Sequence, residues 1–76
     1  MKETKNYSAE SIRTIIDQYM KQNKVSLYKE LDSENRLLKF QIEKAQEAMR
    51  TLLNLMEQGF NEAEAWEIVS KDVVYF

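Results

Sequence analysis

The sequence predicts an all-α protein, a small helical bundle with a long central helix. Three observations lead to this fold class. Proline is absent from the 76 residues and glycine occurs once, so nearly every segment is compatible with a helix. Apolar residues recur at intervals of three and four along most of the chain, which is the spacing of one helix face. A chain of this length holds only one small domain, which we place at residues 8–76.

The first helix is predicted over residues 9–22, after a polar segment, residues 1–7, that we expect to be frayed. Ser8 stands before the first helical residue, where its hydroxyl can accept a hydrogen bond from a free amide of the first turn. Asn23 is a candidate for a left-handed residue that ends this helix. One face of the helix is apolar and needs a covering element. That face consists of Ile12, Ile15, Ile16, Tyr19 and Met20.

A long central helix is predicted over residues 26–58, with Ser26 as its N-cap. Residues 32–35 include three potential cap residues but neither Gly nor Pro, so a bend there and a continuous helix are both open. From Tyr28 to Met56 the chain follows alternating steps of three and four, which define a heptad seam. Such a seam predicts a coiled-coil-like pairing of two central helices.

The end of the central helix carries the clearest local signal in the chain. Gly59 fits the left-handed position of a Schellman motif. Asn61 and Glu64 then form a capping box for a last helix, predicted over residues 62–71. The tail, residues 73–76, is β-branched and aromatic, so we expect it to pack on the bundle or on a partner.

A partner chain is predicted from the length. A domain of this size buries roughly 60% of the surface that its unfolded chain exposes, and a homodimer is the simplest further source of burial. Asn35 can pair with its counterpart in a parallel dimer, or it can cap a helix that starts after residue 32. Trp66 can anchor an interface or lie in the core of its own chain. The candidate interface residues are Asn35, Leu38, Ile42, Ala45, Met49, Leu52, Met56 and Trp66.

The composition argues against an enzyme. Neither Cys nor His is present, which removes disulfides, thiolate zinc sites and the commonest general base. Carboxylate pairs such as Glu43 and Glu47 lie one helical turn apart, but di-metal bundles add His to such pairs. We therefore predict no catalytic residue, no cofactor and no metal. The lack of Cys, of a signal-peptide pattern and of a long apolar run further predicts a cytoplasmic protein without a membrane segment.

Binding to DNA is the alternative function. Residues 9–45 can be read as three short helices, with residues 25–31 as the first helix of a helix-turn-helix. The charge distribution disfavours this interpretation, because residues 1–50 have a net charge of +2 and residues 51–76 have one of −4. A nucleic-acid-binding protein usually carries a pronounced basic stripe. The candidate nucleic-acid-binding residues are Lys21, Lys24, Lys29, Arg36 and Lys39.

Short segments of the chain resemble the small TnpV-like accessory proteins of bacterial transposons. They are residues 19–21 (YMK), 26–31 (SLYKEL), 67–69 (EIV) and 74–75 (VY). The resemblance implies a mobile-element accessory protein, and TnpV-like proteins have been likened to excisionases, which bend DNA without cutting it. The acidic last third of the chain departs from such a role. We therefore favour a non-enzymatic, self-associating protein-interaction module, a regulator or inhibitor encoded by a mobile element or phage, over an excisionase-like DNA-binding protein.

Overall fold

The computed structural model describes residues 6–76 and confirms the all-α fold, since no strand occurs in that range. Helix α1 spans Ala9–Asn23, α2 spans Val25–Ser33, α3 spans Leu37–Glu57 and α4 spans Glu62–Val69. A short π-helical segment, η1, continues α4 over Ser70–Val74.

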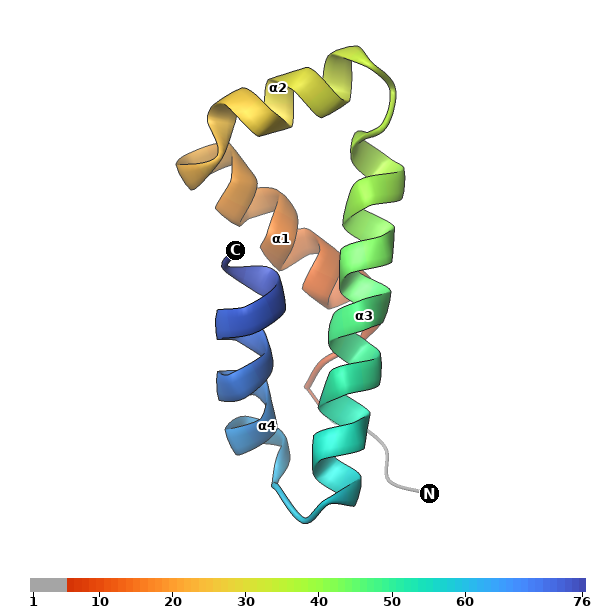
Figure 1. Ribbon diagram of the computed structural model, residues 1–76, viewed down its shortest axis with the longest axis vertical. Coiled ribbons are helices and arrows are strands. Elements are labelled where there is room, and N and C mark those ends of the chain that lie inside the picture. Colours follow the sequence, from red (N-terminus) through yellow and green to blue (C-terminus); the bar gives the residue numbers. More distant parts are fainter. Residues whose placement is uncertain (1–5) are drawn as a thin grey trace.

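The helices form an elongated bundle with extents of 41 × 19 × 16 Å. Helix α3 runs along most of its length, and α4 with η1 returns beside it in the opposite direction (Figure 1). Helix α1 crosses α3 obliquely, and α2 lies across one end of the bundle. Because α3 contacts every other helix, it is the element around which the core is built.

Helix α1 begins where the sequence predicts. The Ser8 hydroxyl accepts a hydrogen bond from the Ser11 N–H at 3.1 Å, and the Ser11 hydroxyl accepts one from the Ser8 N–H at 2.8 Å. The prediction of Asn23 as a left-handed cap is wrong, because Asn23 is still helical and the cap is Lys24, with a φ of −131°. Helix α2 starts directly after Lys24, so Ser26 lies inside its first turn and is not its N-cap.

The predicted central helix is broken at Asn35, which has a φ of +59°. The Asn35 N–H donates to the carbonyl of Asp32 at 3.1 Å, and the Arg36 N–H donates to the carbonyl of Leu31 at 2.8 Å. This is the Schellman pattern, with Asn in the left-handed position that Gly usually occupies. Asn35 thus ends α2. It does not lie on the seam of a continuous helix, and it does not cap α3, whose N-cap is Arg36.

The turn between α3 and α4 has the predicted form. Gly59 has a φ of +110°, and the Phe60 N–H donates to the carbonyl of Leu55 at 3.2 Å, as a Schellman motif requires. The Asn61 side chain accepts a hydrogen bond from the Glu64 N–H at 2.8 Å, and the Glu64 carboxylate accepts one from the Asn61 N–H at 3.2 Å. This capping box starts α4 in the antiparallel direction.

The chain before α1 is attached to α4. Of the segment expected to fray, residues 1–5 lie outside the described residues. Asn6 donates two hydrogen bonds to the Glu62 carboxylate, at 3.1 and 2.9 Å. The Tyr7 ring stacks on the Trp66 ring, with a centroid distance of 4.3 Å and an angle of 17°. Trp66 is therefore half-buried against its own chain.

The core lies between α1, α3 and α4, and the apolar tail completes it. The Tyr19 hydroxyl donates a hydrogen bond to the Phe76 carbonyl at 2.7 Å, which fastens the tail to α1. The tail thus packs on its own bundle, which is one of the two alternatives that the sequence left open. The buried core residues are Ile12, Ile16, Met20, Leu31, Ala45, Ala48, Leu52, Met56, Ala65, Val69, Val73 and Val74.

Candidate interaction surface

The heptad residues of α3 divide between the core and the surface. Ala45 and Leu52 are 1% and 0% exposed, and Met56 is 8% exposed, because all three pack in the core of the single chain. A second chain cannot reach them unless the bundle opens. The chain's own helices therefore cover part of the seam that the sequence assigned to a partner.

Other apolar residues of α3 border the solvent. Leu38 is 60% exposed and Ile42 is 39% exposed. Met49 and Leu53, further along the helix, are half-buried. The spacing of these four residues places them on one side of α3, and we name them the α3 stripe. A row of accessible, large apolar side chains on one helix face is typical of a surface that contacts another protein.

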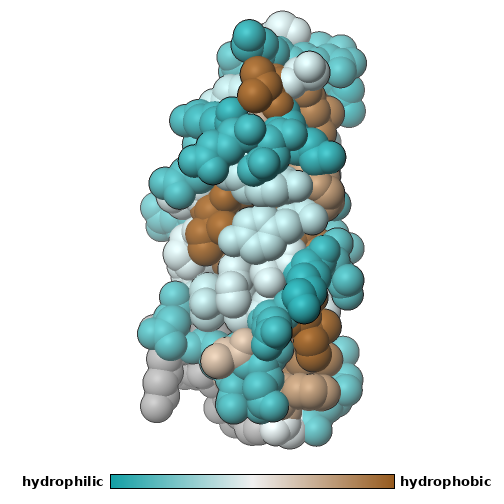
Figure 2. Space-filling view, turned by 90° about the vertical axis from the view of Figure 1, so that its left-hand side faces the viewer, coloured by the Kyte–Doolittle hydropathy of each residue, from teal (hydrophilic) through white to brown (hydrophobic). Residues whose placement is uncertain are grey.

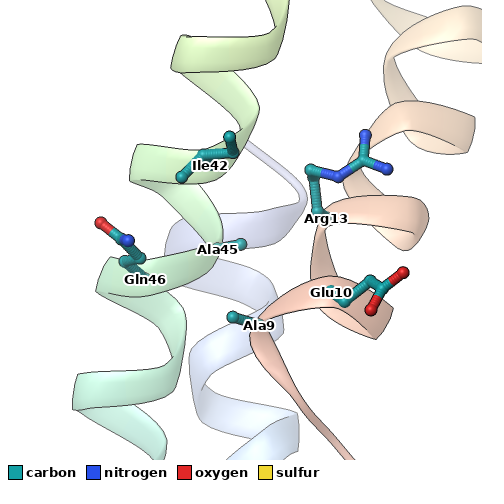
Figure 3. Close-up of a pocket in the computed structure, with 6 residues that line it drawn as sticks. All are labelled: Ala9, Glu10, Arg13, Ile42, Ala45 and Gln46. Atoms are coloured by element: carbon teal, nitrogen blue, oxygen red, sulfur yellow. The ribbon is translucent and has the colours of Figure 1, made fainter.

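A groove of about 290 Å³ lies beside the stripe, between α3 and the start of α1 (Figure 3). The short side chains of Ala9 and Ala45 face each other across it, and Ile42 lies on α3, about one turn before Ala45. The groove is open because two alanines fill little space between the helices. Its lining residues are Ala9, Glu10, Arg13, Ile42, Ala45 and Gln46.

A polar network ties α1 to α3 at the edge of this groove. Arg13 donates to the side-chain carbonyl of Gln41 at 3.2 Å, and the Gln41 amide donates to the Asp17 carboxylate at 2.9 Å. Lys21 pairs with the same carboxylate at 3.0 Å, and this pairing raises the pKa of Lys21. Burial raises the pKa of Asp17, but the hydrogen bonds from Gln41 and Lys21 and the nearby positive charges outweigh it. The pKa of Asp17 therefore lies below its ordinary value of 3.8.

Two of the five cations proposed for nucleic-acid binding form ion pairs with carboxylates of the same chain. Lys21 is paired with Asp17 at 3.0 Å, and Arg36 is paired with Glu34 at 3.1 Å. The ammonium of Lys24 lies 6.0 Å from the centre of an aromatic ring in the tail. The pairing of two cations with carboxylates reduces the local positive charge. The other two cations, Lys29 and Lys39, are exposed.

An aromatic cluster around the tail is a feature that the sequence did not reveal. The rings of Tyr19 and Phe40 each lie 5.8 Å from the ring of Phe76, centroid to centroid. The Lys44 ammonium lies 5.0 Å from the centre of the same Phe76 ring. These residues come from α1, α3 and the tail, so no local spacing could have shown that they meet.

The side of the molecule that carries the tail and α4 offers no continuous apolar surface. Figure 2 shows this side, on which the hydrophobic patches are small and separated by hydrophilic side chains. The α3 stripe is therefore the better candidate for an interface.

Neither a metal site nor a membrane segment is found in residues 6–76. No group of three potential metal ligands comes together there, and none of the helices has both the length and the apolarity to cross a bilayer. Comparison of the chain with protein-family models, with curated proteins and with solved structures gave no match. The resemblance to TnpV-like proteins stays a prediction, and the function has to be inferred from the geometry.

Proposed function

We propose that this protein is a non-enzymatic interaction module that self-associates through the α3 stripe. The observation that carries the proposal is the exposure of Leu38 and Ile42, one turn apart on the longest helix and beside an open groove. Each square ångström of apolar surface that a partner covers there contributes roughly 25 cal/mol. Self-association thus supplies burial that a chain of this size lacks.

The charges on the outward face of α3 favour a protein partner over nucleic acid. Lys39 and Arg50 are exposed on this face, and so are Glu43 and Glu47. Two cations and two carboxylates give the face no excess of positive charge. Phosphate contacts need such an excess, whereas a protein surface can match both signs.

The size and composition of the module support a proposal about its cellular setting. A small, cysteine-free protein that binds other chains fits a cytoplasmic regulator or inhibitor of another protein. The resemblance to TnpV-like proteins supports an origin in a mobile element or phage.

The substitution Ile42→Asp tests the proposal. It is expected to abolish self-association, because the new charge would be buried in the interface without a partner. Since Ile42 is 39% exposed in the single chain, the variant should remain helical. Sedimentation equilibrium measures the mass, and circular dichroism measures the helix content.

Asn54→Asp is the matched control, because it adds the same charge at an exposed position of α3 outside the stripe. This variant should associate like the unsubstituted protein. If the unsubstituted protein is a compact monomer at high micromolar concentration, the proposal is wrong.

A helix-turn-helix-like DNA-binding accessory protein is the second candidate. The break at Asn35 favours it, because α2 and α3 become two helices joined by a short turn. Retention on DNA at low salt, weakened by Lys29→Ala and Lys39→Ala, would support this function. Carboxylates near that turn would repel phosphates, which is why we rank this candidate second. They are Glu30, Asp32 and Glu34.

A further inference from the structure

The segment before α1 covers one face of α4. Glu62 and Trp66 are one helical turn apart in α4, so their side chains lie on the same face of the helix. The Glu62 carboxylate accepts the two hydrogen bonds from Asn6, and the Trp66 ring stacks on the Tyr7 ring. We name residues 6–8 the N-terminal strap. Its contacts show which chemistry this face of α4 accepts, namely N–H donors at the carboxylate and a flat group on the indole ring.

The N-terminal strap lies at the surface and can open without unfolding the bundle. Asn6 and Ser8 are exposed, and Tyr7 is half-buried. The Ser8 carbonyl accepts a hydrogen bond from the Ile12 N–H at 2.9 Å, which fixes the end of the strap to α1 and not to α4. Surface segments of this kind open locally while the helices that carry the core stay folded. An open strap would leave the two α4 side chains accessible to a partner.

An arginine side chain combines both contacts that the strap makes with α4. Its guanidinium group is flat, stacks on aromatic rings and donates hydrogen bonds to a carboxylate in a fork. Tryptophan is the aromatic residue that attracts cations most strongly. A single arginine above Trp66 can therefore also donate to Glu62, and it would occupy the place that Tyr7 and Asn6 take together.

The charge around this face favours a basic partner. Residues 51–76 have a net charge of −4, and the first turn of α4 carries the carboxylates of Glu62 and Glu64. Such a surface attracts a positively charged segment. We propose that Glu62 and Trp66 bind an arginine side chain of a basic segment of another protein, and that the N-terminal strap covers this site in the free chain. The site is distinct from the α3 stripe, so the proposal does not depend on self-association.

Peptide binding to the full chain tests the proposal. Trp66 is the only tryptophan of the chain, so its fluorescence reports on the site directly. Hexa-arginine and hexa-lysine are the probes, because they carry the same charge and only the first has guanidinium groups. A closed strap lowers the apparent affinity by the fraction of open molecules, so Tyr7→Ala should bind hexa-arginine ~10-fold more tightly than the unsubstituted protein does. The same variant should bind hexa-lysine several-fold more weakly than hexa-arginine.

Matched variants separate opening of the strap from damage to the fold. Tyr7→Phe keeps a ring on Trp66 and should bind hexa-arginine like the unsubstituted protein. Asn6→Ala removes one of the two hydrogen bonds to Glu62 and should raise the affinity by less than Tyr7→Ala does. Because Asn6 is exposed, this variant still tests the strap if circular dichroism shows that Tyr7→Ala has lost helix. Tyr28→Ala lies in α2, at the opposite end of the bundle from the start of α4 (Figure 1), and should leave the affinity unchanged.

A second pair of variants tests the carboxylate. In the Tyr7→Ala background, Glu62→Gln should weaken hexa-arginine binding more than Glu64→Gln does. Both remove one charge from the same turn, and Gln at position 64 can keep the capping box of α4. Equal weakening by the two variants would show that general charge attraction, and not a contact with Glu62, binds the peptide.

Three further outcomes would overturn the proposal. Equal hexa-arginine affinities of Tyr7→Ala, Asn6→Ala and the unsubstituted protein would show that the strap does not cover the site. Equal binding of hexa-arginine and hexa-lysine would show that the site does not recognise the guanidinium group. Binding of hexa-arginine without a change in Trp66 emission would place the peptide on another surface.

Discussion

Gln41 is the residue whose role was hardest to read from the sequence. A polar residue in an amphipathic helix normally faces solvent, yet Gln41 is 2% exposed and connects Arg13 to Asp17. Its partners lie 28 and 24 residues away along the chain, and only the crossing of α1 over α3 brings them together. Helical periodicity predicts which face is buried, but it does not predict which polar groups meet across two helices.

The lowered pKa of Asp17 makes part of the stability dependent on pH. The folded-state pKa lies below the ordinary value of 3.8, so the ionised carboxylate stabilises the fold fully above that value. This contribution is lost as the pH falls through the lowered folded-state pKa. Asp17→Asn should therefore reduce the free energy of unfolding by about 1 kcal/mol at neutral pH and by almost nothing in strong acid.

Urea unfolding followed by circular dichroism at both pH values measures this difference. Glu47→Gln changes an exposed carboxylate in the same way and serves as the control. An equal effect of Asp17→Asn at the two pH values would mean that its charge does not stabilise the fold.

Helix ends that carry a strong signal in the local sequence were predicted correctly, and the other helix ends were not. Gly59 marked the end of α3, because Gly readily adopts the positive φ that a Schellman motif requires. Asn35 has the same function at the end of α2, but Asn also caps helix N-termini, so the sequence left its role open. Between α1 and α2 only Lys24 intervenes, without a side-chain cap, and the predictions for Asn23 and Ser26 failed there.

Gly59→Ala tests the left-handed end of α3. A Cβ at this position would meet no atom within 4 Å, so the substitution acts through backbone strain alone. With a φ of +110°, Gly59 lies where other residues are strained. We expect the free energy of unfolding to fall by about 1–2 kcal/mol. Denaturant titration measures the change.

Asn35→Gly is the matched control, because it introduces a glycine at a left-handed position instead of removing one. At a φ of +59°, glycine carries no steric penalty, so this variant should be as stable as the unsubstituted protein or slightly more stable. A neutral Gly59→Ala would contradict the strain argument for that turn.

For the whole molecule, the sequence predicted that α3 has an apolar face but not what covers each part of it. A heptad spacing arises whenever one side of a helix is buried, whether by a second chain or by helices of the same chain. Here the fold places Leu52 in the core and leaves Leu38 exposed, although both belong to the same heptad seam. The difference follows from where α1 and α4 lie along α3, which is a property of the tertiary arrangement.

These two leucines therefore predict different dependences of thermal stability on concentration. Self-association stabilises the folded state by mass action, so the melting temperature of the unsubstituted protein should rise with protein concentration. Leu38→Ala should melt like the unsubstituted protein when dilute and should lose most of that rise. Leu52→Ala should cost about 2–5 kcal/mol and melt lower at every concentration, because it leaves a cavity in the core. Calorimetry over about a hundredfold range of concentration measures the melting temperatures of the unsubstituted protein and of the two variants. A Leu38→Ala variant that is destabilised equally at every concentration would show that Leu38 stabilises the single chain, and it would remove the α3 stripe as the dimer interface.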